Sequence, residues 1–205
     1  MGSGSVLIIL PLVNSIEQRR LRISLALAVL LLVGGCGHGP IRTKQQSRPP
    51  REAFGVQTLA GRVVAIGDGD TVVVLDSANR QHRIRLAGID APELHQTFGE
   101  QSRLSLSGLL FGKDVSVSYQ KIDQYGRPVG KILLDGRDIN LEQVKAGMAW
   151  HYKFYEDEQT PEDRESYAKA EAEARAARRG LWQDPNPVEP STFRNAERRA
   201  RQEAR

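Results

Sequence analysis

The stretch from Val63 to Glu93 constrains the fold most, because it contains the pattern of three short strands joined by tight turns. Residues 63–66 and 71–75 are rich in β-branched side chains, and Gly67-Asp68-Gly69 interrupts them as a hairpin turn does. Residues 83–86 alternate charged and apolar side chains, which is typical of a half-buried strand. The stretch therefore predicts three adjacent strands of one sheet.

Four carboxylates lie at the ends of these strands, Asp68 and Asp70 in the first turn and Asp90 and Glu93 after the third strand. Adjacent strands bring both pairs to one end of the sheet, where the charges repel unless a cation neutralises them. A hard divalent cation with oxygen ligands does this well. The turn alone is weak evidence, because Asp and Gly also occupy turns for conformational reasons. No Cys/His spacing predicts zinc, since the histidines are scattered at positions 38, 82, 95 and 151.

Two arginines add to this pattern. Arg85 lies inside the third strand, where it is either an ion-pair partner of a neighbouring acid or a phosphate ligand. Arg127 lies in a second turn, over residues 123–128, and offers another planar guanidinium that can meet the first across a phosphate.

Helices and further strands follow the third strand. Residues 97–100 form a capping box with Thr97 as the cap, and the helix that it opens has Leu106, Leu109 and Leu110 on one face and Gly112 as its stop. Residues 115–119 and 129–134 are predicted strands, with a hairpin at Asp135-Gly136.

Two more helices are expected near the end of the folded region. We expect Asn140 to cap a helix that runs to about Gly147, and Thr160-Pro161 to begin a long helix that Gly180 stops. About five strands and about three helices make an α+β chain, and the short antiparallel strands favour a small closed barrel.

The flanking segments differ in composition from this region. Residues 1–36 carry three arginines, then an apolar run over residues 23–33, then small residues directly before Cys36. This order is typical of the leader of a bacterial lipoprotein, in which Cys36 would be the lipidated residue. A plain secretory signal or an N-terminal anchor is the alternative. Residues 37–57 are predicted to be a flexible linker, residues 58–184 the folded domain, and residues 185–205 a Pro-rich and then basic tail. A solvated tail is the simplest interpretation, with contact to nucleic acid or an anionic membrane as the alternative.

The overall composition excludes little. The net charge of +4 is weak evidence for an anionic partner, and the single cysteine excludes an internal disulfide or a cysteine-based metal cluster.

Three motifs together resemble those of the staphylococcal nuclease (thermonuclease) family, in the same order and at compatible spacing. They are Asp68-Gly69-Asp70-Thr71, the run from Arg85 to Glu93, and Asp123-Gln124-Tyr125-Gly126-Arg127. Residues 180–182 and 184–187 are also typical of bacterial members. The resemblance implies a five-stranded OB-fold barrel with helices and a calcium-dependent endonuclease that cuts DNA and RNA to leave 3′-phosphate ends.

The resemblance also implies roles for single residues. Asp70 and Asp90 would bind Ca²⁺ directly together with the backbone carbonyl of Ala91, where the family's best-studied pattern has threonine, and Asp68 would act through water. The catalytic residues would be Arg85 and Arg127, which grip the phosphate, and Glu93, which takes a proton from the attacking water. Bases would stack mainly on Tyr155, with Tyr152 or Lys153 assisting and with little sequence preference, whereas Trp150 and Phe154 are expected in the core.

The calcium ligands and the leader also give expectations about where the protein is located. Two direct carboxylates predict weak calcium binding, with a dissociation constant on the order of 10⁻⁴–10⁻³ M, which suits a site outside the cytoplasm. The leader agrees, so we expect an extracytoplasmic protein that is anchored through lipid on Cys36 or secreted, and monomeric. The alternatives are a non-catalytic OB-fold module that binds nucleic acid or a partner, and an envelope protein with a structural calcium site. The combination of Arg85, Glu93 and Arg127 argues against the first alternative, and replacing Glu93 by Gln separates an enzyme from a structural protein.

Overall fold

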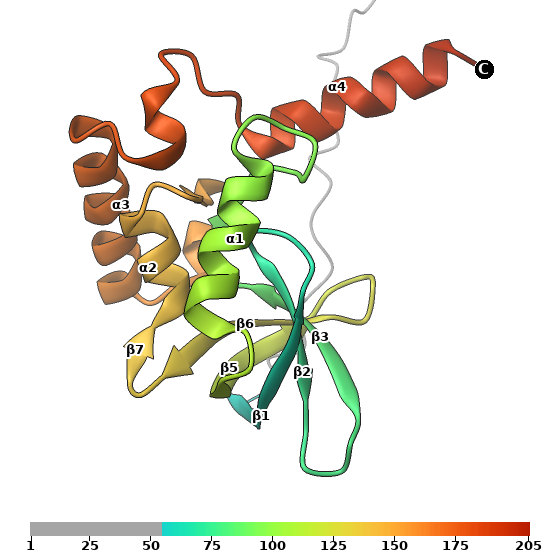
Figure 1. Cartoon of the computed structure of the whole chain (residues 1–205), viewed down its shortest axis with the longest axis vertical. Coiled ribbons are helices and arrows are strands. Elements are labelled where there is room, and N and C mark those ends of the chain that lie inside the picture. The colour runs from blue at the N-terminus through green and yellow to red at the C-terminus, as the bar shows by residue number, and fades with distance from the viewer. Residues whose placement is uncertain (1–54) are drawn as a thin grey trace, which may run out of the picture. The chain divides into compact units, whose positions relative to one another are not determined.

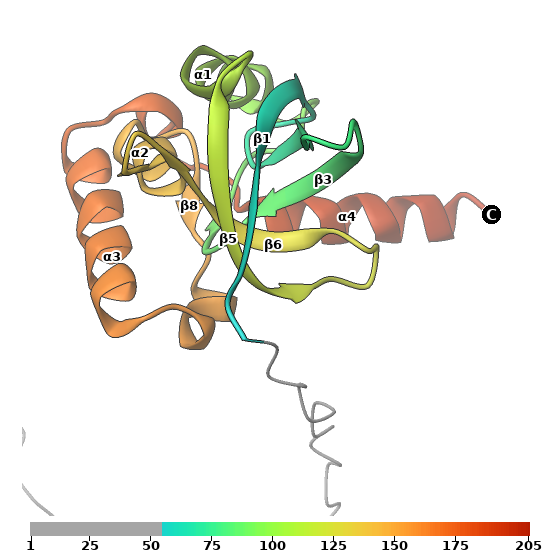
Figure 2. The same cartoon turned by 90° about the horizontal axis from the view of Figure 1, so that it is seen from below.

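A closed β-barrel organises the computed structural model, which describes residues 55–205. The predicted leader with Cys36 and the linker up to residue 54 lie outside the described residues. The main sheet has the strand order β3-β2-β1-β5-β6-β7, and β3 also pairs in parallel with β6, so that five long strands close on themselves (Figures 1 and 2). The five long strands are β1 (Gln57–Ile66), β2 (Thr71–Leu75), β3 (Gln81–Leu86), β5 (Asp114–Ile122) and β6 (Pro128–Leu134), and the short β7 (Arg137–Asp138) pairs with β6 at the edge. The five-stranded OB-fold barrel is confirmed.

The β-branched runs form strands because alternate side chains fill the barrel. In β1 and β2, Val63, Val72 and Val74 are fully buried, and β1 pairs with β2 in antiparallel register with Val63 opposite Val74. Each apolar side chain buried in this way contributes about 1.5–3 kcal/mol to folding. The core continues through Ile84, Leu86, Val117 and Ile132 of the other strands, Leu106 and Leu110 of helix α1 (Gly99–Leu110), and Ile139 and Val144 of helix α2 (Ile139–Lys145).

Helix α1 (Gly99–Leu110) packs its predicted leucine face on the barrel, but its start differs from the prediction. Phe98, with a φ of 67°, is the N-cap residue and no side chain caps the helix, so the prediction that Thr97 is the cap is wrong. The preceding loop folds back onto the helix through backbone bonds from Gln96 to Glu93 and from Gly99 to Gln96, both 2.8 Å. This path leaves Thr97 exposed to solvent.

Helix α2 (Ile139–Lys145) is capped two residues earlier than predicted. Asp138 accepts a bond from the Leu141 amide at 3.1 Å, whereas Asn140 is buried inside the helix. The Asn140 side chain accepts from the Ile132 amide at 3.1 Å and donates to the carbonyls of Ala87 and Gly130 at 3.0 and 3.1 Å. Asn140 therefore joins α2 to two barrel segments, and the prediction that it is a cap is wrong.

Helix α3 (Pro161–Ala176) begins as predicted, because the Thr160 hydroxyl accepts from the Asp163 amide at 3.2 Å. It ends four residues before Gly180, which instead opens the short 3₁₀ helix η2 (Gly180–Gln183). The remaining small elements are β4 (Ile89–Asp90), its antiparallel partner β8 (Trp150–His151), and the 3₁₀ helix η1 (Lys153–Glu158). Along the described residues, no helix combines the length and the apolar character that crossing a bilayer requires.

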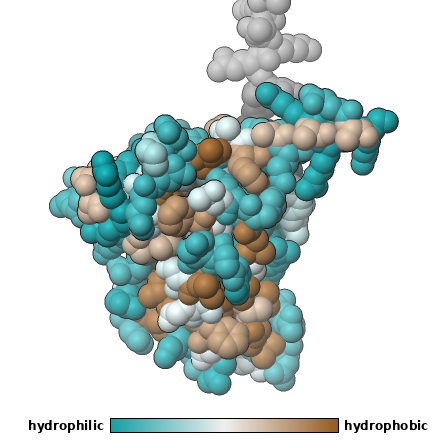
Figure 3. Space-filling model, turned by 45° about the horizontal axis from the view of Figure 1, so that its top comes forward, coloured by the Kyte–Doolittle hydropathy of each residue, from teal (hydrophilic) through white to brown (hydrophobic). Residues whose placement is uncertain are grey.

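The C-terminal segment is not a plain solvated tail. It forms α4 (Pro190–Glu203), whose first turns lie against the barrel and whose remainder projects outward (Figures 1 and 2). Figure 3 shows this projecting arm as largely hydrophilic. The prediction of a solvated tail is therefore wrong for the first turns of α4, which make side-chain contacts with the site described below.

Candidate active site

The two carboxylate motifs meet where β1 and β2 turn and where β3 ends. The buried Asp70 carboxylate accepts a bond from the Ala91 amide at 2.7 Å, and this bond joins segments 21 residues apart. Asp68 supports the turn by accepting from the Asp70 amide at 3.0 Å. Strand pairing places Thr71 opposite Arg85, so the arginine lies beside the first motif as the sequence predicts.

Arg85 connects the two motifs. Its Nη1 lies 2.7 Å from Asp70 Oδ2, and its Nη2 donates to Asp90 Oδ1 at 2.9 Å. All three side chains are largely buried, with exposed fractions of 15%, 8% and 3% for Arg85, Asp70 and Asp90. Of the two interpretations that the sequence leaves open for Arg85, the ion pair is present in this structure. Such a pair can also hold the guanidinium in place for a phosphate.

The electrostatics of the cluster favour added positive charge. Burial raises the pKa of the Asp70 carboxyl, Arg85 opposes this effect, and the neighbouring charges of Asp68 and Asp90 add to it. Burial lowers the pKa of Arg85, but Asp70 and Asp90 outweigh burial and hold that pKa above its ordinary value. Carboxylates that are crowded and desolvated in this way are stabilised by any cation that reaches them.

Arg194 of α4 is a site residue that the sequence analysis missed. Its Nη1 donates to Asp90 Oδ1 at 3.1 Å and to Glu93 Oε1 at 2.9 Å, and its Nη2 donates to Asp90 Oδ2 at 3.0 Å. Burial opposes a raised Arg194 pKa, but the hydrogen bonds to Asp90 and Glu93 hold it well above its ordinary value. No local pattern marks Arg194, because it is one of several arginines in a basic segment.

The donor atoms suit a hard cation, although they do not form a ready-made cage. Asp70 and Asp90 supply carboxylate oxygens of the kind that Ca²⁺ prefers, and the hydrogen bond from the Ala91 amide to Asp70 places Ala91 next to them. Within residues 55–205, no three His, Cys, Asp or Glu side chains converge closely enough to hold a metal ion. In this structure, the guanidinium groups of Arg85 and Arg194 engage oxygens of Asp70, Asp90 and Glu93.

Arg127 lies near this cluster in the sheet but is held within its own turn. β3 and β6 pair with Arg85 opposite Val129, two residues beyond Arg127. Arg127 Nε donates to Asp123 Oδ2 at 2.8 Å, and its guanidinium lies 5.4 Å from the centre of the Tyr125 ring. The structure therefore places Arg127 on the neighbouring strand, with contacts to Asp123 and Tyr125 in place of a contact with Arg85.

The predicted base-stacking residues fall into two groups. Tyr152 borders the site, since burial and the charge of Asp90 both raise its pKa, and its ring lies edge-on to Tyr155 at 5.1 Å. Lys121 lies over the Tyr155 ring at 4.4 Å. Lys153 donates instead to the buried Glu171 of α3 at 2.7 Å. Trp150 is buried as expected, but Phe154 is 67% exposed, so its predicted place in the core is wrong.

Fold and site together define the class of protein. It is an α+β protein with an OB-fold barrel, and clustered carboxylates and arginines lie at the ends of its strands.

Comparisons with known proteins agree with this class and narrow it. The family model described as staphylococcal nuclease homologue matches residues 83–184. An uncharacterized endonuclease of Haemophilus influenzae is 42% identical over 137 residues, which cover 67% of this chain and 74% of that protein. A micrococcal nuclease of Shigella flexneri is 43% identical over 150 residues, or 68% of this chain and 83% of that protein. The chain belongs to the staphylococcal nuclease family, as the motifs predict.

Proposed function

We propose that this protein is a Ca²⁺-dependent endonuclease that hydrolyses phosphodiester bonds of DNA and RNA and leaves 3′-phosphate ends. The observation that carries the proposal is the position of Arg85 between Asp70 and Asp90, with Glu93 next to them. The names of the relatives, an endonuclease and a micrococcal nuclease, support the same reaction class.

Asp70, Asp90 and the Ala91 carbonyl would hold the calcium ion, which neutralises negative charge on the phosphate when it is bound. Asp68 supports these ligands through the turn that it shares with Asp70. Arg85 is preplaced by its two ion pairs, so it can stabilise charge on the phosphate oxygens in the transition state without reorganising. Arg127, on the strand beside Arg85, would release Asp123 to contact the same phosphate.

Glu93 is the candidate general base. Its side chain is 29% exposed, so water can reach it, and it lies close enough to Asp90 to share the Arg194 guanidinium. A carboxylate in this position can take a proton from the attacking water, an effect that typically accelerates a reaction about 10²–10⁴-fold. Tyr152 and Tyr155 border the same region and would stack bases without reading sequence.

We also propose an extracytoplasmic location. The support lies in the sequence alone: the charged and apolar leader that ends at Cys36, together with a calcium site of only two direct carboxylates, which would fill at extracellular calcium concentrations.

The proposal is tested by incubating the purified full chain with single-stranded DNA, duplex DNA and RNA in Ca²⁺, Mg²⁺ or EDTA. We expect cleavage in Ca²⁺ with 3′-phosphate ends, and a loss of at least about 10²-fold in Glu93→Gln, because general-base catalysis is removed. Glu100→Gln is the matched control, since Glu100 is exposed at the start of α1 and pairs with Arg103 of the same helix. Nucleic-acid binding without cleavage in any metal would instead establish a non-catalytic OB-fold module.

A further inference from the structure

The contact of Arg194 with the site has a specific consequence for metal binding. Asp90 has two carboxylate oxygens, and both are engaged: Oδ1 by Arg85 and Arg194, and Oδ2 by Arg194. A calcium ion binds through carboxylate oxygens, and a guanidinium repels a cation that approaches the same atoms. In this arrangement, Arg194 and a metal ion on Asp90 therefore compete directly.

The same contact also acts on Glu93. Arg194 Nη1 donates to Glu93 Oε1 at 2.9 Å, so this hydrogen bond occupies one oxygen of the carboxylate. While Arg194 is in place, Glu93 Oε1 is therefore not free to take a proton from the attacking water. The Nη1 protons of Arg194 point at Asp90 and Glu93, so Arg194 would have to leave these carboxylates before it could contact a phosphate.

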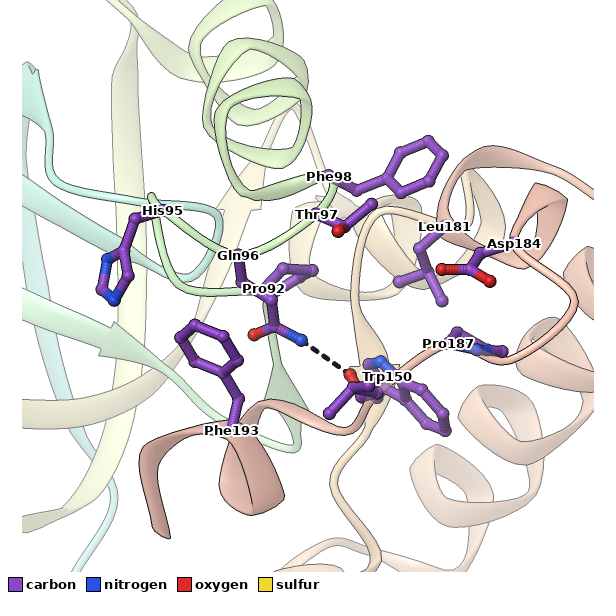
Figure 4. Close-up of a pocket in the computed structure, with 11 residues that line it drawn as sticks. Pro92, His95, Gln96, Thr97, Phe98, Trp150, Leu181, Asp184, Pro187 and Phe193 are labelled. Atoms are coloured by element: carbon purple, nitrogen blue, oxygen red, sulfur yellow. Dashed lines mark hydrogen bonds between the residues drawn. The ribbon is translucent and has the colours of Figure 1, made fainter. Parts of the chain in front are cut away.

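Helix α4 is seated on the loop that follows β4 by a small set of contacts. Gln96 Nε2 donates to the Val188 carbonyl at 2.7 Å, the Phe193 ring lies 5.2 Å from the His95 ring, and His95 Nε2 lies 2.7 Å from Glu197 Oε1. Figure 4 shows Phe193, Gln96 and Pro92 beside a pocket of about 170 Å³ that separates this seat from Trp150 and Leu181. The seat is incompletely packed.

Beyond Glu197 the helix is exposed and basic, and Pro190 is its only buried residue. An element that is held by few buried contacts opens at a low free-energy cost compared with the barrel. Helix α4 can therefore leave its seat while the barrel stays folded.

We propose that α4 is an autoinhibitory latch, in which Arg194 takes the place of the metal cation on Asp90 and Glu93 until a divalent cation displaces it. The calcium part rests on the proposed function. Metal binding then requires the open state, so the apparent dissociation constant is the intrinsic one divided by the open fraction of molecules. A latch that is open in one molecule in ten weakens calcium binding about tenfold.

The latch is tested by calorimetric titration of CaCl₂ into the full chain, with the variants Arg194→Ala, Phe193→Ala and Arg198→Ala. We expect Arg194→Ala to bind calcium about tenfold more tightly if the latch is open in one molecule in ten. Phe193→Ala should change affinity in the same direction, because it weakens the seat of α4 without removing a charge. Arg198→Ala is the control, since Arg198 is exposed on the same helix.

Hydrogen exchange supplies a readout that does not depend on activity. Calcium should accelerate exchange across residues 190–203 of the wild type, and the same residues should already exchange fast in Phe193→Ala without calcium.

The outcomes separate the two proposals. Equal calcium affinity in the wild type and Arg194→Ala would overturn the latch alone. Slower cleavage by Arg194→Ala at saturating calcium would make Arg194 a third phosphate ligand and also overturn the latch. Calcium that binds to neither protein would overturn the calcium-dependent function, and the latch with it.

Discussion

Buried polar side chains at single positions decide how the helices attach to the barrel. Tyr167 is 1% exposed, and its hydroxyl donates to Asp138 Oδ2 at 2.9 Å. Asp138 in turn caps α2 and lies 3.3 Å from Lys131. Burial raises the pKa of Tyr167 well above its ordinary value of about 10, and the charge of Asp138 adds to the effect. The phenol therefore stays protonated and keeps α3 bonded to α2.

The raised pKa of Tyr167 predicts that the protein loses stability at alkaline pH. The pKa of Tyr167 is higher in the folded protein than in the unfolded chain. The contribution of the protonated Tyr167 to stability is therefore complete below about pH 10 and is lost as the pH rises further. We expect Tyr167→Phe to cost about 1.5–3 kcal/mol at neutral pH, as for a lost bond to a charged acceptor, and to flatten the decline above pH 10. Urea unfolding from pH 7 to 11 measures both effects. Tyr125→Phe, at an exposed position, is the control, and an unchanged alkaline slope in Tyr167→Phe would contradict this account.

At the scale of elements, the turn over residues 67–70 owes its position to close contact with α1. A Cβ atom at Gly69 would lie 1.8 Å from Ser102 Oγ and 2.6 Å from the Ala91 Cβ. The glycine therefore lets the turn that carries Asp68 and Asp70 touch both α1 and the second carboxylate motif. Gln143 of α2 reaches the same turn, donating to the Gly69 carbonyl at 3.1 Å.

We predict that Gly69→Ala pushes this turn away from α1 and displaces Asp70. Overpacking of this kind typically costs about 1–3 kcal/mol, and cleavage should fall more than stability because the site itself shifts. Thermal unfolding and cleavage rates measure the two effects. Gly67→Ala is the matched control, since its Cβ would lie 3.3 Å from the Thr71 carbonyl oxygen, a much milder contact. Equal activity in the two variants would show that the turn tolerates displacement.

At the scale of the whole molecule, a second apolar cluster carries the core toward the C-terminus. Trp150, Ala174, Leu181 and Trp182 are buried together, and the Arg175 guanidinium lies 3.8 Å from the Trp182 ring centre and 4.7 Å from that of Trp150. Arg175 is thus more than a solvated charge at a helix end. Trp182 precedes the segment that leads to α4, so this cluster holds that segment near the carboxylates.

Contacts between arginines and phosphates should make nucleic-acid binding depend on the salt concentration. On the proposed function, Arg127→Ala removes one phosphate contact and lowers the slope of log affinity against log salt by about 0.7 for a single strand. Arg62→Ala should leave the slope unchanged, because Arg62 pairs with Asp114 and lies opposite Leu75, at the end of β2 away from Asp70. Titrations of a fluorescent oligonucleotide in EDTA at several salt concentrations test this. Equal slopes would remove Arg127 from the substrate path.

The strands, the Gly67–Gly69 turn, the long helix that starts at Thr160 and the family motifs were all predictable, because they depend on local periodicity and turn chemistry. The proximity of Asp70, Arg85 and Asp90 followed as well, since adjacent strands leave little freedom. Caps were less predictable: Thr97 and Asn140 suit the role by type, but folding of the loop and burial assigned them elsewhere.

Only the tertiary structure decided that Arg194 meets Asp90 across 104 residues, that Asn140 bonds to the barrel and that Phe154 is exposed. These outcomes depend on which surfaces meet when the barrel closes and the helices pack on it. The local sequence determines which segments become strands and helices and which residues can carry charge at their ends. It carries no mark that separates Arg194 from the neighbouring arginines of α4, because the difference lies in the carboxylates that each one meets after folding.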